Sequence, residues 1–273
     1  MSSIAAMAQP PPGRYRQPTM IPRLYVSASL GDGQRVALDG DRTHYLKNVM
    51  RRAIGDEVGL FNGRDGEWLG RIHSFSRNSA EVALDAERRP QAASPDLWLA
   101  FAPIKRQRID YLVEKATELG VSVLLPVMTR RAEAARVNTE RLTNIAIEAA
   151  EQTERLDVPE VKEAVSLDRL LANWPEDRIL FVCAEAGEAM PIAEAALRHK
   201  GKPAGFLIGP EGGFAAGELD ALRKLPFVVA IGLGPRLLRA ETAAVAALAC
   251  WQAVAGDGAA ADSRPPFRHE FTS

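Results

Sequence analysis

The chain has 273 residues, 47% hydrophobic and 25% charged, which predicts an ordinary globular core in one large or two smaller domains. A formal net charge of -1 excludes a globally basic nucleic-acid-binding protein, so any such function must depend on local clusters of charge. The two cysteines, Cys183 and Cys250, lie in apolar runs without CxxC or Cys/His spacing. This excludes a disulfide scaffold and predicts reduced core cysteines in a cytoplasmic protein.

Both ends of the chain are expected to be tails. Residues 1–19 include Pro10-Pro11-Pro12 and lack the apolar stretch of a signal peptide, and residues 256–273 are rich in Gly, Ala and Pro. The very apolar segment 243–254 is about half the length needed to cross a bilayer. We therefore expect a disordered N-terminal tail, a flexible C-terminal tail, a buried helix and no membrane partner.

Residues 20–90 have the pattern of a small β domain. Short stretches of strand type are separated by turn signals such as Gly31-Asp32-Gly33 and Asn62-Gly63. The predicted strands have the sequences RLYV, QRVAL, EVGLF, GEWLGRI and AEVAL. Their lengths and spacing predict a compact β-barrel of about five or six strands, interrupted by one helix over residues 41–52.

This helix carries four cations and no acidic residue after Asp41. Two interpretations remain open for it. The cations are either a solvated helix face or, with His44, Tyr45 and Asn48 beside them, contacts to RNA, which is recognised by stacking as well as by phosphate pairing.

After a Pro-containing linker over residues 87–96, the pattern changes to apolar runs that alternate with helical stretches. Strands are expected at 97–103, 121–127, 179–184, 204–209 and 227–233, and helices at about 109–119 and 139–155. Continuous apolar strands that alternate with helices predict a mainly parallel sheet covered on both faces, within a domain of residues 95–255.

Two Gly-Pro corners in this domain are the strongest candidates for a ligand site. Residues 206–214 (FLIGPEGGF) and 231–242 (IGLGPRLLRAET) both run from a strand through a turn into a helix. Neither matches a P-loop or a dinucleotide fingerprint, and each alone is also consistent with a structural turn. Because parallel strands end at the same edge of a sheet, the two corners together predict a pocket there.

Charged residues near these corners have both structural and functional interpretations. Glu211 either caps a helix or accepts hydrogen bonds from sugar hydroxyls, and Glu241 either stabilises a helix N-terminus or acts in the pocket. Arg239 suits a developing negative charge. Lys105, Arg106 and Arg108 are either solvated or bind phosphate, although cations at a helix N-terminus oppose its dipole.

Two further patterns bear on chemistry. Glu148, Gln152 and Arg155 form a polar stripe at helical spacing, which is more typical of a solvent-facing face than of a site. The four histidines have no metal-ligand spacing, so no metal is expected.

The sequences LIGPEGGF (207–214), LGPRLLRAETA (233–243), EKATELGV (114–121), EAAEQ (148–152) and HYLKNVMRRAIGDEVGLFNG (44–63) resemble the RsmE-type methyltransferases of the SPOUT superfamily. The resemblance covers about residues 20–255. It implies a homodimer with an N-terminal PUA-like barrel and a C-terminal parallel sheet threaded through a trefoil knot. It also implies methyl transfer from S-adenosylmethionine to N3 of a uridine in the 16S ribosomal RNA of the small subunit. Thr153-Glu154-Arg155 departs from the family pattern, which leaves the role of Arg155 open.

The resemblance also implies site residues. The methyl donor would be held by Ala184, by Leu207, Gly209, Pro210, Glu211, Gly212 and Gly213 in the first corner, and by Ile231, Leu233, Gly234, Leu237 and Leu238 in the second. We hypothesise that Arg239 stabilises the uracil anion and that Glu241 orients Arg239 or relays the proton. RNA contact is assigned to seven cations: Arg23, Lys47, Arg51, Arg52, Lys105, Arg106 and Arg108.

Two rival functions remain. The first is a catalytically silent RNA-binding or assembly factor that keeps a methyltransferase-like fold, and binding of S-adenosylmethionine would distinguish it. The second is an α/β enzyme acting on a small nucleotide, which would have no need of the basic helix at 41–52.

Overall fold

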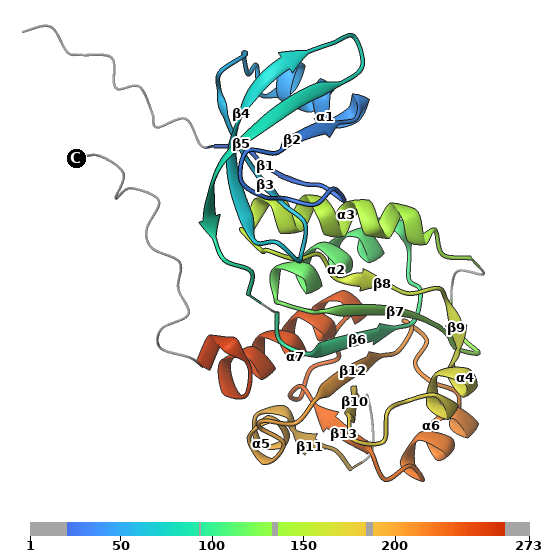
Figure 1. The fold of residues 1–273 in the computed structure, drawn as a ribbon. Coiled ribbons are helices and arrows are strands. Elements are labelled where there is room, and N and C mark those ends of the chain that lie inside the picture. Colours follow the sequence, from blue (N-terminus) through green and yellow to red (C-terminus); the bar gives the residue numbers. More distant parts are fainter. Residues whose placement is uncertain (1–20, 93, 133–135, 184–187, 260–273) are drawn as a thin grey trace, which may run out of the picture.

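The structure is a computed structural model that describes residues 21–92, 94–132, 136–183 and 188–259. An N-terminal β-sheet lies above a larger C-terminal α/β part, with helix α3 (Thr139–Gln152) directly beneath the N-terminal strands (Figure 1).

The N-terminal sheet has five strands in the order β1-β3-β4-β5-β2. They are β1 (Arg23–Tyr25), β2 (Arg35–Leu38), β3 (Glu57–Phe61), β4 (Glu67–Phe75) and β5 (Ala80–Arg89). β1 pairs with β3 in parallel and the other pairs are antiparallel. The five predicted strands are thus confirmed. In these ladders β1 and β2 lie at the two ends of the order, so closure into a barrel stays a prediction.

Burial alternates with a period of two along β2, whereas four consecutive residues of β3 are buried. In β2, Val36 and Leu38 are buried while Arg35 and Ala37 are exposed. The long β4–β5 pair contains three register shifts, which bend and twist a sheet. β5 continues to Arg89, so the first three residues of the predicted linker belong to a strand instead.

The predicted basic helix is present but shorter than expected. It consists of α1 (Gly40–His44), whose first turn is capped by the Asp39 carboxylate, and a π-helical turn, Tyr45–Val49. Arg51 adopts a left-handed φ of 53°, a conformation that a helix cannot contain. The helix therefore ends before Arg51 rather than at Arg52.

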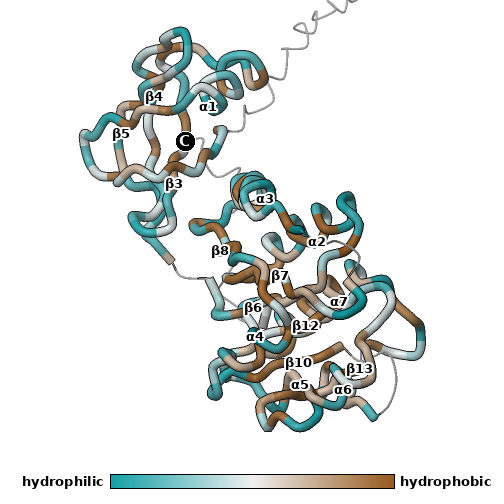
Figure 2. The backbone as a smooth tube through the Cα atoms, turned by 90° about the vertical axis from the view of Figure 1, so that its right-hand side faces the viewer, coloured by the Kyte–Doolittle hydropathy of each residue, from teal (hydrophilic) through white to brown (hydrophobic). Residues whose placement is uncertain are grey.

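The C-terminal part is built on a parallel sheet in the order β11-β13-β10-β12-β6-β7-β8, with β9 paired to β7. Every described ladder in it is parallel, as predicted. Its strands are β6 (Leu97–Phe101), β7 (Val123–Met128), β8 (Glu160–Val161), β9 (Val165–Ser166), β10 (Ile179–Cys183), β11 (Met190–Pro191), β12 (Ala204–Ile208) and β13 (Val228–Gly232). Figure 2 shows the strands in the middle of this sheet as strongly hydrophobic.

Helices cover both faces of this sheet. One core contains residues of α2 (Arg106–Glu118), α3, α5 (Ile192–Arg198) and α7 (Ala240–Val254), packed on Phe101, Phe181 and Phe206. The opposite core contains residues of α4 (Leu167–Ala172) and α6 (Ala216–Arg223). The two-sided cover explains why the strands are apolar throughout. None of the helices in the described ranges combines the length and apolarity needed to cross a membrane.

The two parts are joined through β1 and the C-terminal end of α3. The guanidinium of Arg23 donates hydrogen bonds to the carbonyls of Ala150 (3.2 Å), Glu151 (3.1 Å) and Arg155 (2.7 Å). The backbone N–H of Tyr25 donates to the Glu151 carboxylate at 2.9 Å. A cation placed on the last carbonyls of a helix also interacts favourably with the helix dipole.

Candidate functional site

The two Gly-Pro corners meet at the carboxyl edge of the parallel sheet. β12 leads into the first corner and β13 into the second, and only β10 lies between these strands. The two corners line one cavity of about 510 Å³, together with the end of β10 and the first turn of α7. Its size lies in the usual range for a site that binds a small ligand. The predicted convergence of the corners is therefore present.

The first corner brings the backbone close to the cavity. A Cβ on Gly209 would lie 2.8 Å from the ring of Phe214, so this position has no room for a side chain. Gly213 has a φ of 65° and donates a hydrogen bond to the carbonyl of Pro210 at 2.9 Å. The carbonyl of Gly212 accepts a hydrogen bond from Arg131 at 2.9 Å. These glycines shape a bare, tightly turned loop.

The second corner supplies an apolar wall and a charged rim. Ile231 is fully buried, whereas the side chain of Leu237 is 80% exposed at the mouth of the cavity. Arg239 is exposed, lines the cavity and makes no ion pair with another described residue. Its backbone forms the N-cap of α7.

Most of the predicted donor-binding residues line this cavity. Those that do are Gly209, Pro210, Glu211, Gly213, Ile231, Leu233, Gly234, Leu237 and Leu238. Gly212 lies in the same loop but not in the wall. Leu207 lies in the core shared with α4 and α6, because alternate residues of β12 face opposite sides of the sheet. Ala184 lies outside the described residues.

Sequence reasoning missed several wall residues, namely Cys183, Ile208, Phe214, Pro235, Arg236, Ala240 and Ala243. Cys183 could have been found, because it ends a strand that is parallel to both corner strands. Burial raises the pKa of the Cys183 thiol to about 12, so the thiol stays protonated and acts as an apolar wall.

Three charged side chains form a cluster (the rim cluster) beside the cavity: Arg108 and Glu211 line its wall, and Glu241 lies next to Arg108 but not in the wall. Arg108, from the first turn of α2, forms ion pairs with Glu211 of the first corner and with Glu241 of α7, the latter at 3.7 Å between Nε and Oε1. The Glu241 side chain is only 12% exposed, and its Oε2 is buried without a hydrogen-bond partner among the described residues. Glu241 was expected to orient Arg239 or to relay the proton; its ion-pair partner among the described residues is Arg108.

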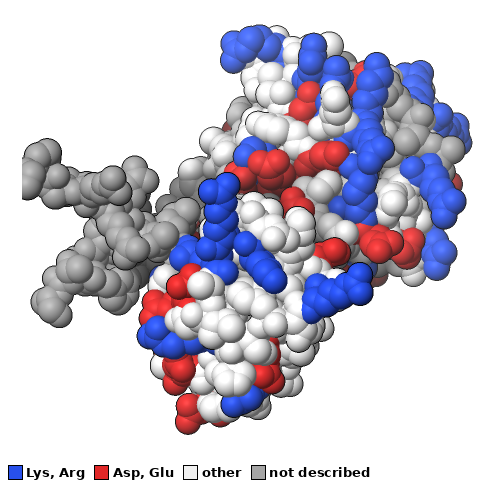
Figure 3. Space-filling model, turned by 90° about the horizontal axis from the view of Figure 1, so that it is seen from above, with Lys and Arg blue, Asp and Glu red and all other residues white. Residues whose placement is uncertain are grey.

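The seven cations predicted to contact RNA have different surroundings. Lys47, Arg51, Lys105 and Arg106 are exposed, and Arg52 is half-buried. The Arg23 side chain is 4% exposed and is bound to the carbonyls of α3 and to Glu67, so its burial argues against a phosphate contact. Arg108 lies in the rim cluster. Figure 3 views the molecule from above and shows several groups of Lys and Arg side chains on the face turned to the viewer.

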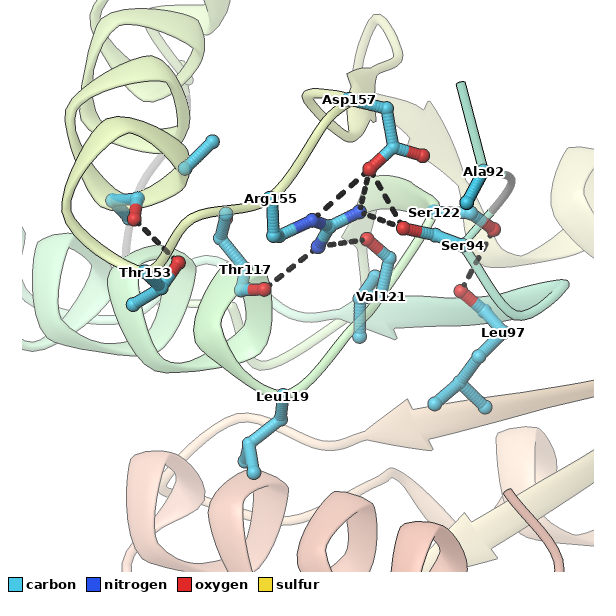
Figure 4. Close-up of polar contacts among 12 residues, drawn as sticks. Ala92, Ser94, Leu97, Thr117, Leu119, Val121, Ser122, Thr153, Arg155 and Asp157 are labelled. Carbon is cyan, nitrogen blue, oxygen red and sulfur yellow. Dashed lines mark hydrogen bonds and ion pairs between the residues drawn. The ribbon is translucent and has the colours of Figure 1, made fainter. Parts of the chain in front are cut away.

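Arg155 has a structural environment that the sequence did not reveal. Its guanidinium donates to the carbonyls of Thr117 (2.7 Å) and Val121 (2.9 Å), to the Ser94 hydroxyl (2.9 Å) and to the Asp157 carboxylate (2.9 Å) (Figure 4). Arg155 therefore fixes the end of α2 to the chain that follows α3. Nearby, the side-chain amide of Gln252 in α7 donates a hydrogen bond to the carbonyl of Leu119, directly after α2, at 2.6 Å.

A metal site is not apparent at the cavity or elsewhere in the described ranges, where no group of three or more His, Cys, Asp and Glu side chains is arranged to hold an ion. The cavity itself offers a glycine-rich loop, an apolar wall and the exposed guanidinium of Arg239, with the Arg108 cluster beside it.

Comparisons with known proteins bear on both parts of the chain. Residues 92–252 match the RNA methyltransferase domain family, and residues 38–85 match the RNA methyltransferase PUA domain family. The ribosomal RNA small subunit methyltransferase E of Rickettsia conorii is 34% identical over 229 residues, which cover 83% of this chain and 93% of that protein. The Bacillus subtilis protein of the same name is 29% identical over 225 residues, which cover 78% of this chain and 87% of that protein.

Two solved structures of methyltransferases also superimpose on most of this chain. The ribosomal RNA small subunit methyltransferase E of Neisseria gonorrhoeae, bound to S-adenosyl methionine, superimposes with a TM-score of 0.78 at 28% identity, covering 87% of this chain and 99% of that one. A methyltransferase of Legionella pneumophila in complex with the same cofactor superimposes with a TM-score of 0.75 at 27% identity, covering 85% and 97%.

Proposed function

The chain belongs to the ribosomal RNA small subunit methyltransferase E family, and we propose that it transfers a methyl group from S-adenosylmethionine to N3 of a uridine in 16S ribosomal RNA. The observation that carries this proposal is the meeting of the two Gly-Pro corners in one cavity at the carboxyl edge of the sheet. Two relatives with the same fold over more than four-fifths of the chain have S-adenosylmethionine bound.

The residues of the cavity fit this donor. The Phe214 ring packs against Gly209 in one wall, and Ile231, Leu233 and Leu238 offer apolar surface to a flat purine. Glu211, which lines the cavity, would accept hydrogen bonds from ribose hydroxyls. When bound, S-adenosylmethionine supplies an electrophilic methyl group: the N3–methyl bond forms as the sulfur–methyl bond breaks, and that electron pair stays on sulfur.

The chain contributes charge and position to the reaction. Uridine N3 must lose its proton before or as it attacks, which leaves negative charge on the uracil oxygens. The exposed guanidinium of Arg239 stabilises that anion. The N3 proton passes to solvent or to Glu241, whose carboxylate lies at the start of α7 beside Arg108 and whose side chain is 12% exposed. Holding the two reactants in line supplies much of the remaining rate.

RNA is held outside the cavity by the exposed cations. Lys47, Arg51 and Arg52 of the N-terminal domain (20–90) and Lys105 and Arg106 of the methyltransferase domain (95–255) bind phosphates, while the corners bind the donor. The proposal includes a closed PUA-like barrel, a trefoil knot in the C-terminal part, a homodimer, and action in the cytoplasm on ribosomal RNA or the assembled small subunit.

The direct test is incubation of the protein with undermodified small-subunit particles and S-adenosylmethionine labelled in the methyl group, followed by mapping of the modified base. A 3-methyluridine in 16S ribosomal RNA is the expected product. Replacing Arg239 with alanine should abolish transfer while binding of S-adenosylmethionine, measured by calorimetry, survives. Unchanged turnover in this variant would remove Arg239 from its role.

The same measurements separate the rival functions. A catalytically silent RNA-binding factor would leave the particles unlabelled and would not bind S-adenosylmethionine. An enzyme that acts on a small nucleotide would bind the donor but methylate a free nucleotide rather than the particle.

A further inference from the structure

Arg108 lies at the cavity rim, where the proposed phosphate contact does not account for its surroundings. Its guanidinium faces two carboxylates from different elements, Glu211 after β12 and Glu241 in the first turn of α7. All three side chains are largely shielded, with exposed fractions of 29%, 26% and 12% respectively. The guanidinium is therefore already engaged by groups of opposite charge.

The formal charge of this cluster also argues against phosphate. One cation and two carboxylates sum to a net charge of -1, so the charge of Arg108 is already compensated and the free cations among the described residues of the same wall are Arg236 and Arg239 instead. A cation in the first turn of α2 opposes the dipole of that helix, so helix stability does not account for Arg108.

Arg108 also connects parts of the cavity wall that no shared element holds together. The loop of Glu211 is built from glycines and turns tightly, while Glu241 belongs to a long and well-packed helix. A planar guanidinium presents several donors in a fixed fork and can hold two carboxylates at once. Through Glu211, Arg108 restrains the loop relative to α7.

We infer that Arg108 is a positioning residue of the methyl-donor pocket: it ties the first corner loop to the start of α7 through Glu211 and Glu241, and does not bind RNA phosphate. This inference rests on the proposed function. It assigns to Arg108 an effect on donor affinity, because a loop that is not held must be ordered when the donor binds.

The test compares Arg108→Gln with Arg106→Gln, a matched control on the same helical turn whose arginine is exposed. Affinity for S-adenosylmethionine is measured by calorimetry, and affinity for a 16S ribosomal RNA transcript is measured at several salt concentrations. For Arg108→Gln we expect about a tenfold loss of donor affinity and an unchanged salt slope. For Arg106→Gln we expect unchanged donor affinity and a salt slope smaller by about one, as for a lost phosphate contact.

A double-mutant cycle tests the route through Glu211. If Arg108 acts by holding this carboxylate, the double variant Arg108→Gln/Glu211→Gln should lose little more donor affinity than Glu211→Gln alone. Additive losses would overturn the claim that the loop is positioned through this pair. Arg108→Lys keeps one charge but not the fork, so it should fold normally and recover part of the donor affinity. If Arg108→Gln does not fold, the donor affinity of Arg108→Lys provides the test.

Other results overturn the inference. Arg108 is a phosphate contact if the Arg108→Gln salt slope falls, whatever happens to donor affinity, and it is only a surface ion pair if neither quantity changes. Failure of the proposed function looks different, because the wild-type protein itself would then not bind S-adenosylmethionine.

Discussion

Replacing Glu67 with glutamine should strongly destabilise the N-terminal part and its attachment to α3. Glu67 is fully buried in β4 and is surrounded by three guanidinium groups. Arg23 Nε lies 3.2 Å from Oε2, Arg88 donates to Oε1 at 2.9 Å, and Arg89 donates to Oε2 at 2.8 Å. Two of these arginines also donate to carbonyls at or beyond the end of α3, so the carboxylate holds the joint together.

The expected loss follows from what glutamine leaves behind. Its amide keeps one acceptor oxygen but turns an N–H group toward a guanidinium, so at least one charge-assisted hydrogen bond of about 1.5–3 kcal/mol is lost. Arg88 and Arg89, with side chains 28% and 25% exposed, can turn toward water, whereas Arg23, at 4%, cannot. Removing one partner from a buried ion pair typically costs about 3–5 kcal/mol, and we expect a loss in that range.

Urea denaturation followed by circular dichroism measures this loss, and calorimetry shows whether the N-terminal part now unfolds separately. The matched control is Glu57→Gln on the neighbouring strand, whose ion pair with Arg71 is exposed. Its loss should stay below about 1 kcal/mol. If Glu67→Gln unfolds at the same urea concentration as this control, the reasoning from buried charge is wrong.

The pH dependence gives a second measurement. Burial raises the pKa of Glu67, but the surrounding arginines outweigh burial, and its pKa lies below the ordinary value of 4.5. A carboxyl with a lowered folded-state pKa contributes stability that is present above the unfolded pKa and is lost as the pH falls through the folded pKa. The difference between wild type and Glu67→Gln should therefore be constant near neutral pH and shrink below about pH 4.5.

Three further predictions concern other sites. Arg155→Ala removes hydrogen bonds to two backbone carbonyls and should lower the free energy of unfolding by about 2–4 kcal/mol. Methyl transfer per folded molecule should stay unchanged. Lost transfer in a stably folded variant would give Arg155 a role in the reaction. Gly209→Ala places a Cβ against the Phe214 ring and should weaken binding of S-adenosylmethionine, measured by calorimetry, without unfolding the protein. If the variant and the wild type bind the donor with equal affinity, the loop does not contact the donor. Burial raises the pKa of Glu151 to about 7, so the stability that this group contributes is fully present below pH 4.5 and is lost as the pH rises through 7. In urea titrations the free energy of unfolding of Glu151→Gln should therefore rise relative to wild type by up to about 3 kcal/mol between pH 5 and 8. Parallel pH profiles of the two proteins would contradict this.

The parallel sheet and the meeting of the corners were predictable because both follow from local pattern and a general rule. The apolar runs that became β6, β10 and β12 are too continuous for strands with one wet face. Strands that run in parallel end at one edge, so loops that follow two of them approach each other whatever their exact order. The orientation of Leu207 was also readable in principle, since side chains alternate along a strand.

The partners of the long charged side chains were not predictable in the same way. Arg108 and Arg155 stand in ordinary polar sequence and Arg23 begins a short apolar strand, and each contacts groups far away in the chain. The charge pattern along a sequence shows that a cation is present but not which carboxylate or carbonyl the fold brings to it. The left-handed φ of Arg51, which ends the basic helix early, has no sequence signal either, because glycine and asparagine are the residues that usually mark such a turn.

The missed contacts share a physical consequence for the proposed reaction. Methyl transfer needs the reacting atoms about 3–3.5 Å apart, so RNA held by the N-terminal cations can react only if that domain keeps a fixed position relative to the donor cavity. Apolar packing is weakly directional, whereas the Arg23 guanidinium accepts only a narrow geometry against the carbonyls of α3. α3 in turn packs on α2, whose first turn carries Arg108 into the cavity rim. The buried charges of the joint and the rim cluster therefore lie along one series of packed elements, from the N-terminal strands through α3 and α2 to the cavity.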